Sequence, residues 1–312
     1  MRLPLLLASV VVLAAPAMSQ DNRAPFTVAE TGRSFRSFDE ALASLQGGDG
    51  TIRIAPGTYH ECVVQDSGNV AYVAEVPGKV IFERAICEGK ATLVLRGASA
   101  RVDGIVFMHT FVNDGNGAGI RIEKGNLNVA NAMFIDGQCG ILSASDPAST
   151  IIIDRSTFAG LGKDPTGNGA HAVYVGEYGA LKVTRSRFER GTGGHYLKSR
   201  APRIEVLDSS FDDSRGQATN YMIDLSNGAS GRIAGNSFVV GPNKENYSTM
   251  ITVAPEGIKN SSAGLVVENN RAWLAEGFKW KTTLVGNWSG DKVTVRNNQL
   301  ADRIAPEGSR YF

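Results

Sequence analysis

The chain has 312 residues, of which 42% are hydrophobic, and its 32 Lys and Arg residues nearly balance its 31 Asp and Glu residues. Nucleic-acid-binding proteins usually carry a basic excess, so this balance argues against that class. The hydrophobic content and the 36 glycines indicate an ordered, turn-rich globular chain and exclude extensive disorder.

The N-terminal segment 1–19 is predicted to be a secretory signal peptide. It has a single basic residue, Arg2, an apolar run over 3–14 and small residues at 17–19. The apolar run is shorter than the roughly 18 residues that cross a bilayer, and no later segment reaches that length. We therefore expect a mature single-domain chain over 20–312 that is periplasmic or secreted and has no membrane span.

The first structural element of the mature chain is predicted to be a short helix. Segment 34–45, SFRSFDEALASL, places four apolar residues on one helical face. These are Phe38, Ala41, Leu42 and Leu45. Segment 51–61, TIRIAPGTYHE, follows with the apolar alternation of strands.

A strand-like segment that ends in phenylalanine recurs through the rest of the chain. Its copies are ARVDGIVF (100–107), LNVANAMF (127–134), IIIDRSTF (151–158), LKVTRSRF (181–188), IEVLDSSF (204–211) and GRIAGNSF (231–238). A small polar residue precedes the phenylalanine by two positions in the later copies, and two degenerate copies extend the series. These residues are Ser156, Ser186, Ser209, Asn236, Asn270 and Asn298.

Segments of a second strand type lie between these copies, and no helix separates them. Examples are GAGIRIEKG, AHAVYVGE, GHYLKSR and NYMIDLS. Parallel strands in a βαβ sheet need helical crossovers, so this pattern predicts the stacked coils of a solenoid instead. Equivalent residues then stack at about 4.8 Å, and the small polar positions form an internal Ser/Asn ladder.

Taken together, the recurring strands, the entering helix and segment 51–61 resemble the pectin-lyase-like superfamily over essentially the whole mature chain. The resemblance implies an all-β fold, a single-stranded right-handed parallel β-helix whose open N-terminal end is capped by the short helix. Members of that superfamily include polysaccharide lyases, glycoside hydrolases, epimerases and non-catalytic adhesins. The fold alone therefore does not determine the chemistry.

Three cysteines are present, and their spacing suggests no metal site. In the β-helix that the resemblance implies, one coil's length separates Cys62 from Cys87. They are expected to form a disulfide across adjacent coils, with two independent thiols as the alternative. Cys139 is interpreted as a buried small apolar residue.

The second strand type predicts a polar outer face. Aligning its apolar positions turns Val173, Leu197 and Ile223 inward, and therefore Tyr174, Lys198 and Asp224 outward. Arg121 falls near the same row. By the same alternation, two further residues are expected on the outer face beside Lys198, namely Tyr196 and Arg200.

The resemblance to lyases implies roles for these residues. Lys198 would be the general base, Arg200 the partner of a uronate carboxylate and Tyr196 the acid. Tyr174, Asp224 and Arg121 would contact substrate. The alternative for Lys198 is a structural ion pair with Asp224.

Other polar groups have alternative interpretations. His195 is either a catalytic acid or an inward-facing core histidine stacked with His171 and Tyr221. Asp212 and Asp213 are either the carboxylate pair of a hydrolase or solvated turn residues, and the latter is favoured.

No cofactor is expected, although calcium is weakly indicated. The alternating oxygens of Asp114 and Asn116, and of Asp164 and Asn168, resemble parts of a calcium loop. They do not complete one, and turn formation explains them as well.

The leading functional prediction is a monomeric, exported lyase that cleaves an acidic, uronic-acid-containing polysaccharide by β-elimination. The alternative is a non-catalytic carbohydrate-binding or cell-envelope structural protein. An ultraviolet-absorbing unsaturated product would distinguish the two.

Overall fold

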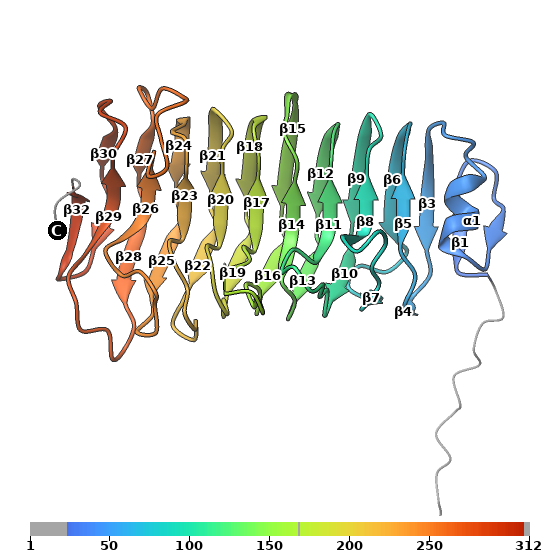
Figure 1. Ribbon diagram of the computed structural model, residues 1–312, viewed down its shortest axis with the longest axis horizontal. Coiled ribbons are helices and arrows are strands. Elements are labelled where there is room, and N and C mark those ends of the chain that lie inside the picture. Colours follow the sequence, from blue (N-terminus) through green and yellow to red (C-terminus); the bar gives the residue numbers. More distant parts are fainter. Residues whose placement is uncertain (1–23, 168, 309–312) are drawn as a thin grey trace, which may run out of the picture.

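Short strands that bury every second side chain wind into an elongated solenoid of three parallel sheets, which are named sheets A, B and C here (Figure 1). The computed structural model describes residues 24–167 and 169–308. The predicted signal peptide at 1–19 lies outside the described residues. The all-β, right-handed parallel β-helix expected from the sequence is confirmed.

Sheet A contains the strands that precede each Ser/Asn ladder position. A hairpin of β1 and β2 pairs antiparallel with β3 at its N-terminal end, and the remaining strands are parallel. In order, the strands are β2 (Ser34–Phe35), β1 (Phe26–Val28), β3 (Gly50–Ile54), β6 (Asn69–Ala74), β9 (Ser99–Asp103), β12 (Asn126–Ala130), β15 (Asp146–Asp154), β18 (Tyr178–Thr184), β21 (Arg203–Leu207), β24 (Ser230–Ala234), β27 (Val266–Glu268) and β30 (Thr294–Arg296).

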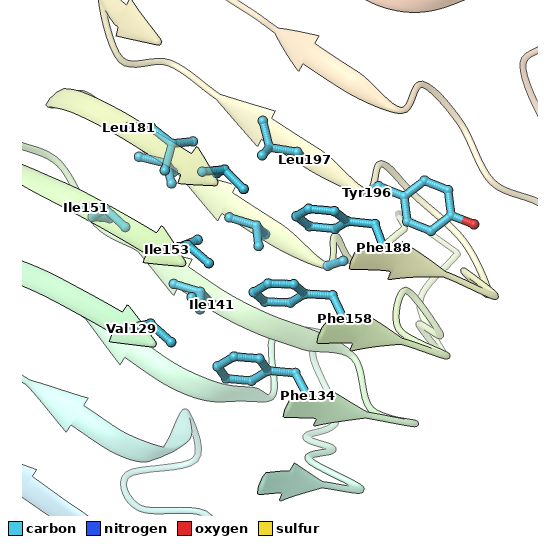
Figure 2. Packing of buried hydrophobic residues seen from close by; sticks show 14 of the residues in the cluster. Val129, Phe134, Ile141, Ile151, Ile153, Phe158, Leu181, Phe188, Tyr196 and Leu197 are labelled. Atoms are coloured by element: carbon cyan, nitrogen blue, oxygen red, sulfur yellow. The ribbon is translucent and has the colours of Figure 1, made fainter. Parts of the chain in front are cut away.

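Sheet B carries the recurring phenylalanines, which stack along the axis of the core. Their ring centroids are 4.7 Å apart between Phe188 and Phe211 and 4.8 Å apart between Phe134 and Phe158 (Figure 2). Its strands are β4 (Gly57–Tyr59), β7 (Val80–Glu83), β10 (Ile105–Met108), β13 (Met133–Ile135), β16 (Thr157–Ala159), β19 (Arg187–Glu189), β22 (Ser210–Asp212), β25 (Ser237–Val240), β28 (Arg271–Leu274) and β31 (Gln299–Leu300).

Sheet C is built from the second strand type. Strands of this sheet hold the outward row that the sequence predicts. In chain order they are β5 (Val63–Gln65), β8 (Ala91–Leu95), β11 (Ala118–Ile122), β14 (Cys139–Ser143), β17 (Val173–Val175), β20 (Leu197–Ser199), β23 (Ile223–Leu225), β26 (Thr249–Val253), β29 (Thr282–Asn287) and β32 (Ile304–Gly308).

The Ser/Asn ladder lies at the corner between sheets A and B. Each ladder side chain accepts a hydrogen bond from the backbone N–H of the equivalent residue one coil earlier. Ser186 N–H donates to Ser209 Oγ at 3.1 Å, and Ser209 N–H donates to Asn236 Oδ1 at 2.9 Å. These bonds satisfy buried backbone donors at a sharp turn, so the ladder fixes the register between coils.

Helix α1 (Phe38–Ala43) covers the N-terminal end of the core, as predicted. Its N-cap Ser37 accepts a hydrogen bond from Glu40 N–H at 3.4 Å. Phe38 and Ala41 are buried, and Phe38 stacks between Phe26 and Phe82 at ring-centroid distances of 4.9 and 5.1 Å. The remaining two predicted face residues are partly buried against the same core, Leu42 and Leu45.

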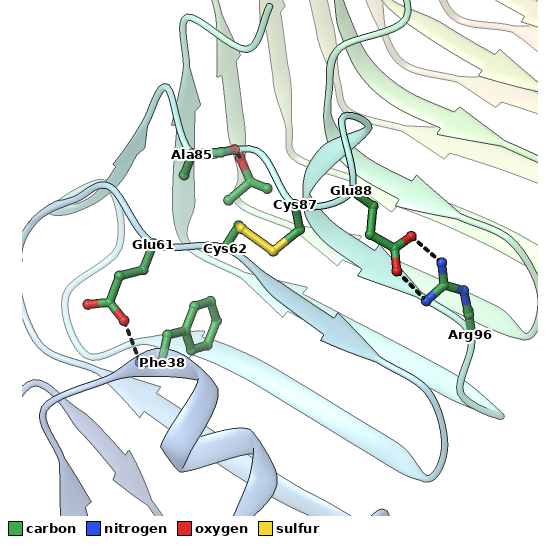
Figure 3. Close-up of a disulfide and its surroundings, with 8 residues drawn as sticks. Phe38, Glu61, Cys62, Ala85, Cys87, Glu88 and Arg96 are labelled. Carbon is green, nitrogen blue, oxygen red and sulfur yellow. Dashed lines mark hydrogen bonds and ion pairs between the residues drawn. A yellow bond between two sulfur atoms is a disulfide. The ribbon is translucent and has the colours of Figure 1, made fainter. Parts of the chain in front are cut away.

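The disulfide joins Cys62 and Cys87, which confirms the pairing expected across adjacent coils (Figure 3). Next to it, Glu61 accepts a hydrogen bond from Phe38 N–H at 2.6 Å, so the first coil also contacts the capping helix. Cys139 is buried with 2% of its surface exposed, as expected for an unpaired apolar residue. Among the described residues, no helix is long and apolar enough to cross a membrane.

Candidate functional site

The outer face of sheet C holds a row of polar residues in the register that the sequence predicts. Val173 pairs with Leu197, and Leu197 with Ile223, so their side chains stack in the core. The adjacent row runs from Tyr174 through Lys198 and Asp224 to Thr252. Consecutive strands therefore bring a phenol, an ammonium group and a carboxylate together.

Strict alternation fails where each strand of sheet C begins. Two consecutive side chains point into the core at these positions, because the chain turns a corner there. The pairs are Ala172 and Val173, Tyr196 and Leu197, and Met222 and Ile223. The residues before the pairs, His171, His195 and Tyr221, consequently lie on the outer side and form a ring stack.

The predicted outward position of Tyr196 is therefore wrong. Tyr196 is 2% exposed and belongs to the core, beside Phe188 (Figure 2). Its hydroxyl donates to Asp213 Oδ1 at 2.7 Å and accepts from Gly191 N–H at 3.0 Å. Burial, together with the Asp213 carboxylate, raises the pKa of Tyr196 well above its usual value. The hydroxyl does not reach the outer face, where an acid for elimination would be needed.

Asp213 is fully buried, which corrects the expectation of a solvated turn aspartate. Its carboxylate also accepts hydrogen bonds from Thr219 Oγ1 at 2.8 Å and from Lys244 Nζ at 3.2 Å. Burial lowers the pKa of Lys244, although the neighbouring carboxylate opposes this effect. The side chains of Lys244 and Asp213 are each 1% exposed, so this pair belongs to the interior and not to a hydrolytic site.

His195 faces the outer cluster, and the expected inward orientation is wrong. Its Nδ1 accepts a hydrogen bond from Tyr221 N–H at 3.1 Å, so the proton of a neutral ring lies on Nε2. Nε2 is 3.3 Å from Asp224 Oδ2. Burial, with the nearby Lys198 charge, lowers the pKa of His195 to about 3, so the imidazole is neutral at pH 7. A neutral ring whose Nδ1 already accepts a hydrogen bond supplies neither a strong acid nor a free base.

The stacking expected for His195 is confirmed. Its ring centroid is 4.8 Å from that of His171 and 5.4 Å from that of Tyr221. His195 N–H also donates to His171 Nδ1 at 3.0 Å, which repeats the bond between Tyr221 and His195 one coil earlier. The ring stack thus holds the starts of three adjacent strands in register.

Lys198 is enclosed by two carboxylates. Its Nζ lies 3.1 Å from Asp224 Oδ2 and also bonds Glu256 Oε1, and its side chain is only 9% exposed. Asp224, with its side chain 2% exposed, additionally accepts from Thr252 Oγ1 at 3.1 Å. The ion pair that was the structural alternative for Lys198 is therefore present.

Arg200 lies beside Lys198 and binds three partners. Its Nε donates to Tyr174 Oη at 2.9 Å, and its two terminal nitrogens donate to Asn227 Oδ1 at 3.0 Å and Glu256 Oε2 at 2.5 Å. The guanidinium is also 5.9 Å from the centroid of the Tyr174 ring. These contacts hold the planar group in one orientation, with a quarter of its side chain exposed.

Glu256 completes what we call the charged cluster, defined as Lys198, Arg200, Asp224 and Glu256. Sequence reasoning missed Glu256, which follows β26 in the segment VAPEG and lies 56 positions from Arg200. Burial raises the pKa of its carboxyl, but hydrogen bonds from Lys198 and Arg200 outweigh burial and hold the pKa below its usual value. Glu256 is therefore an anion at neutral pH.

Arg121 shares the outer row but lies apart from the charged cluster. Arg121 pairs with Leu142, which in turn pairs with Tyr174. Arg121 is therefore two coils away from Tyr174, the hydrogen-bond partner of Arg200. The closest carboxylate to Arg121 Nε is that of Glu123, at 4.0 Å. The structure thus brings together the predicted residues Tyr174, His195, Lys198, Arg200 and Asp224, and leaves out Tyr196 and Arg121.

The segments with a weak resemblance to calcium loops form ordinary turns. Asp114 Oδ1 accepts a hydrogen bond from Asn116 N–H at 3.0 Å, and Asp164 Oδ1 accepts one from Thr166 N–H at 2.8 Å. Asn168 lies outside the described residues. Within 24–167 and 169–308, no group of three His, Cys, Asp or Glu side chains is placed to hold a metal ion.

An aromatic groove of about 890 Å³ lies near the C-terminal coils. Tyr247, on its wall, stacks with Trp280 at a ring-centroid distance of 4.6 Å, and these side chains are about 40% exposed (41% and 39%). The charged residues of the lining are Lys281, Arg303 and Glu245. Asn246 also lines the groove and donates to Tyr221 Oη at 2.7 Å, which links it to the ring stack.

Comparisons with known proteins identify the fold. No protein-family model matches the chain, and no curated protein matches its sequence. Among solved structures, Escherichia coli YbhC has a TM-score of 0.51 at 12% identity, over 88% of this chain and 89% of that one. The rice weevil pectin methyl esterase has a TM-score of 0.49 at 9% identity, over 76% and 82% of the two chains.

A surface protein and adhesin of Streptococcus pneumoniae, PfbA, is also similar, with a TM-score of 0.48 at 13% identity over 86% of this chain and 93% of that one. At such identities a match shows the fold and not the activity. The chain is therefore a parallel β-helix whose fold is similar to that of YbhC.

Proposed function

We propose that the protein binds an acidic polysaccharide on the outer face of sheet C, with Lys198 and Arg200 as the partners of a uronate carboxylate. The observation that carries this proposal is the convergence of both cations on one carboxylate, that of Glu256. Two adjacent cations that hold a carboxylate in a bidentate arrangement form a site of the kind that uronic acids require.

The surroundings of the cation pair support a sugar as the ligand. The Tyr174 ring lies beside Arg200, and aromatic rings pack against the C–H faces of sugar residues. Farther along the solenoid, the groove beside the stacked rings of Tyr247 and Trp280 adds exposed aromatic surface and a charged lining of two cations and the Glu245 carboxylate. A polymer with alternating apolar faces and carboxylates matches this combination of surfaces.

Binding has better support than β-elimination. A lysine base needs a free lone pair on Nζ, whereas Lys198 is engaged by two carboxylates. Tyr196, the acid in the lyase hypothesis, has its hydroxyl in the core, and the His195 ring is neutral, with its Nε2 3.3 Å from Asp224 Oδ2. The charged cluster thus offers an anion-binding surface without an evident acid–base pair.

We also propose that the protein is exported to the periplasm or the medium. Two observations support this location: the signal-peptide pattern at 1–19 and the disulfide between Cys62 and Cys87. Disulfides persist mainly in oxidising compartments. N-terminal sequencing of exported material should begin near Gln20, and a retained Met1 would contradict the export proposal.

The test is a binding panel with a product assay. Purified protein is titrated calorimetrically with polygalacturonate, alginate and a neutral galactan, each with and without calcium, while the absorbance of unsaturated uronates is followed. We expect saturable binding of a polyuronate, no binding of the galactan and no rise in absorbance. Equal affinity for the neutral polymer, or binding of none, overturns the proposal. A rise in absorbance would instead establish the lyase.

A further inference from the structure

The segment 254–264 that follows β26 folds back across the charged cluster, and we call it the strap. Lys259 N–H and Asn260 N–H both donate to Asn227 O, at 3.1 and 2.9 Å. The Asn260 side chain donates to Arg200 O at 3.2 Å. These bonds reach from the coil of β26 over those of β23 and β20.

The strap also forms an exposed ion pair on a third coil. Lys259 Nζ lies 2.5 Å from Glu177, which follows β17, and both side chains are largely exposed. The strap is therefore held by backbone bonds to Asn227 and by this surface pair, independently of Glu256. This arrangement allows the carboxylate of Glu256 to be removed without removing the anchors of the strap.

Glu256 is the outermost member of the charged cluster. Its side chain is 40% exposed, whereas those of Lys198 and Asp224 are 9% and 2% exposed. Its two carboxylate oxygens divide between the two cations, one on Lys198 and one on Arg200. A ligand that approaches from solvent reaches Glu256 before it reaches either cation.

We propose that Glu256 is the specificity-determining residue of this site. Its carboxylate occupies the place of the ligand's carboxylate, and a ligand enters by exchanging one carboxylate for the other. This inference rests on the proposed function, because it assigns the same two cations to a uronate. The new element is that Glu256 competes with the uronate for both cations and so limits the affinity for the polysaccharide.

The exchange explains why the site discriminates by charge. A uronate that displaces Glu256 gives both cations a new carboxylate partner. Neither of these partly buried cations then loses its anionic partner. A neutral sugar would leave Arg200 without its carboxylate partner and Lys198 with Asp224 alone, and a partly buried cation that loses an anionic partner is costly. Neutral glycans are therefore excluded by the penalty of opening the cluster.

A purely structural ion pair predicts different behaviour. If Glu256 only stabilises the fold, its replacement lowers the melting temperature and leaves polyuronate affinity unchanged or reduced. If Glu256 competes with the ligand, its replacement tightens binding, since the variant no longer has to release a charged partner. Affinity thus separates the two interpretations, and the melting temperature alone does not.

The experiment compares Glu256→Gln with wild type by calorimetry, using oligogalacturonate and a neutral galacto-oligosaccharide of equal length. Glu177→Gln is the matched control, because it removes the carboxylate that pairs with Lys259 of the strap and leaves the ion pairs of Lys198 and Arg200 in place. We expect E256Q to bind oligogalacturonate about tenfold more tightly than wild type, and E177Q to remain within about twofold. The neutral oligomer should still bind weakly to each protein.

Unchanged or weaker oligogalacturonate binding by folded E256Q overturns the inference while leaving the proposed function intact. An equal gain in E177Q also overturns it, because loosening of the strap would then be the cause. Failure of wild type and E256Q alike to bind overturns the proposed function as well. If E256Q does not fold, Glu256→Ala, which also removes the competing carboxylate, is judged by the same tenfold criterion.

Discussion

The hydroxyl of Tyr196 lies inside the protein, where it is one of the donors that satisfy the buried carboxylate of Asp213. Tyr196→Phe removes the 2.7 Å hydrogen bond and leaves those from Thr219 and Lys244. We expect the free energy of unfolding to fall by about 1–3 kcal/mol, the usual cost of an unmade bond to a buried polar group. Urea unfolding measures this, and polyuronate affinity should not change. A loss of affinity with unchanged stability would restore Tyr196 to the outer site.

The buried histidines predict a pH dependence of stability. Burial, with the nearby Lys198 charge, lowers the pKa of His171 from 6.5 to about 3. Between pH 6.5 and about 3, His171 is protonated in the unfolded chain but neutral in the folded chain. The free energy of unfolding therefore falls as the pH drops through this range. His171→Gln should make the decline between pH 7 and 4 less steep, as followed by urea unfolding. His60→Gln, at an exposed position, is the comparison, and equal slopes for H171Q and wild type would refute the explanation.

The sequence errors at this scale have a common cause. Alternation assigned Tyr196 to the outer face and His195 to the core, but the corner before each strand of sheet C turns two successive side chains inward. The paired apolar letters Ala-Val, Tyr-Leu and Met-Ile carry that signal in the sequence. Glu256 had no comparable signal, because a strap that folds back over several coils leaves no periodic pattern.

At the scale of the elements, the Ser/Asn ladder predicts how much stability is lost when one of its side chains is removed. Asn236 is 1% exposed, accepts from Ser209 N–H at 2.9 Å and donates to Val206 O at 2.8 Å. Asn236→Ala leaves both backbone groups buried without these partners, so we expect a loss of about 1–3 kcal/mol in chemical unfolding. Asn128→Ala, at an exposed position of β12, should stay within about 0.5 kcal/mol. Equal losses in the two variants would contradict the assigned role of the ladder.

The register of the strands could be predicted because repeated sequence motifs mark equivalent positions in successive coils. Each Phe-terminated copy marks one strand of sheet B, and the polar residue two positions earlier marks one corner. The apolar positions of the second strand type, aligned in the same way, correctly placed Lys198 between Tyr174 and Asp224 in neighbouring strands. The antiparallel hairpin of β1 and β2 was not predicted, because it precedes the first repeat and has no second copy for comparison.

At the scale of the whole molecule, the disulfide near the N-terminal end of the solenoid allows a test of global stability. The disulfide closes a 25-residue separation between the first coils, next to helix α1 (Figure 3). The double variant Cys62→Ser and Cys87→Ser should lose about 2–4 kcal/mol of unfolding free energy, chiefly through a less constrained unfolded chain. Guanidinium unfolding of oxidised wild type and the variant measures the difference. Identical midpoints and slopes would show that the cross-link contributes nothing.

The central claim concerns the surface of the assembled solenoid, where one coil supplies two cations, Lys198 and Arg200, and another coil supplies the Glu256 carboxylate that they bind. The most direct measurement is the affinity of Arg200→Gln for oligogalacturonate, with Arg232→Gln as the matched control on sheet A, where Arg232 pairs with Glu268. We predict that R200Q weakens binding by about tenfold or more, with its melting temperature within a few degrees of wild type, and that R232Q binds as wild type does. Wild-type affinity in folded R200Q would contradict the account.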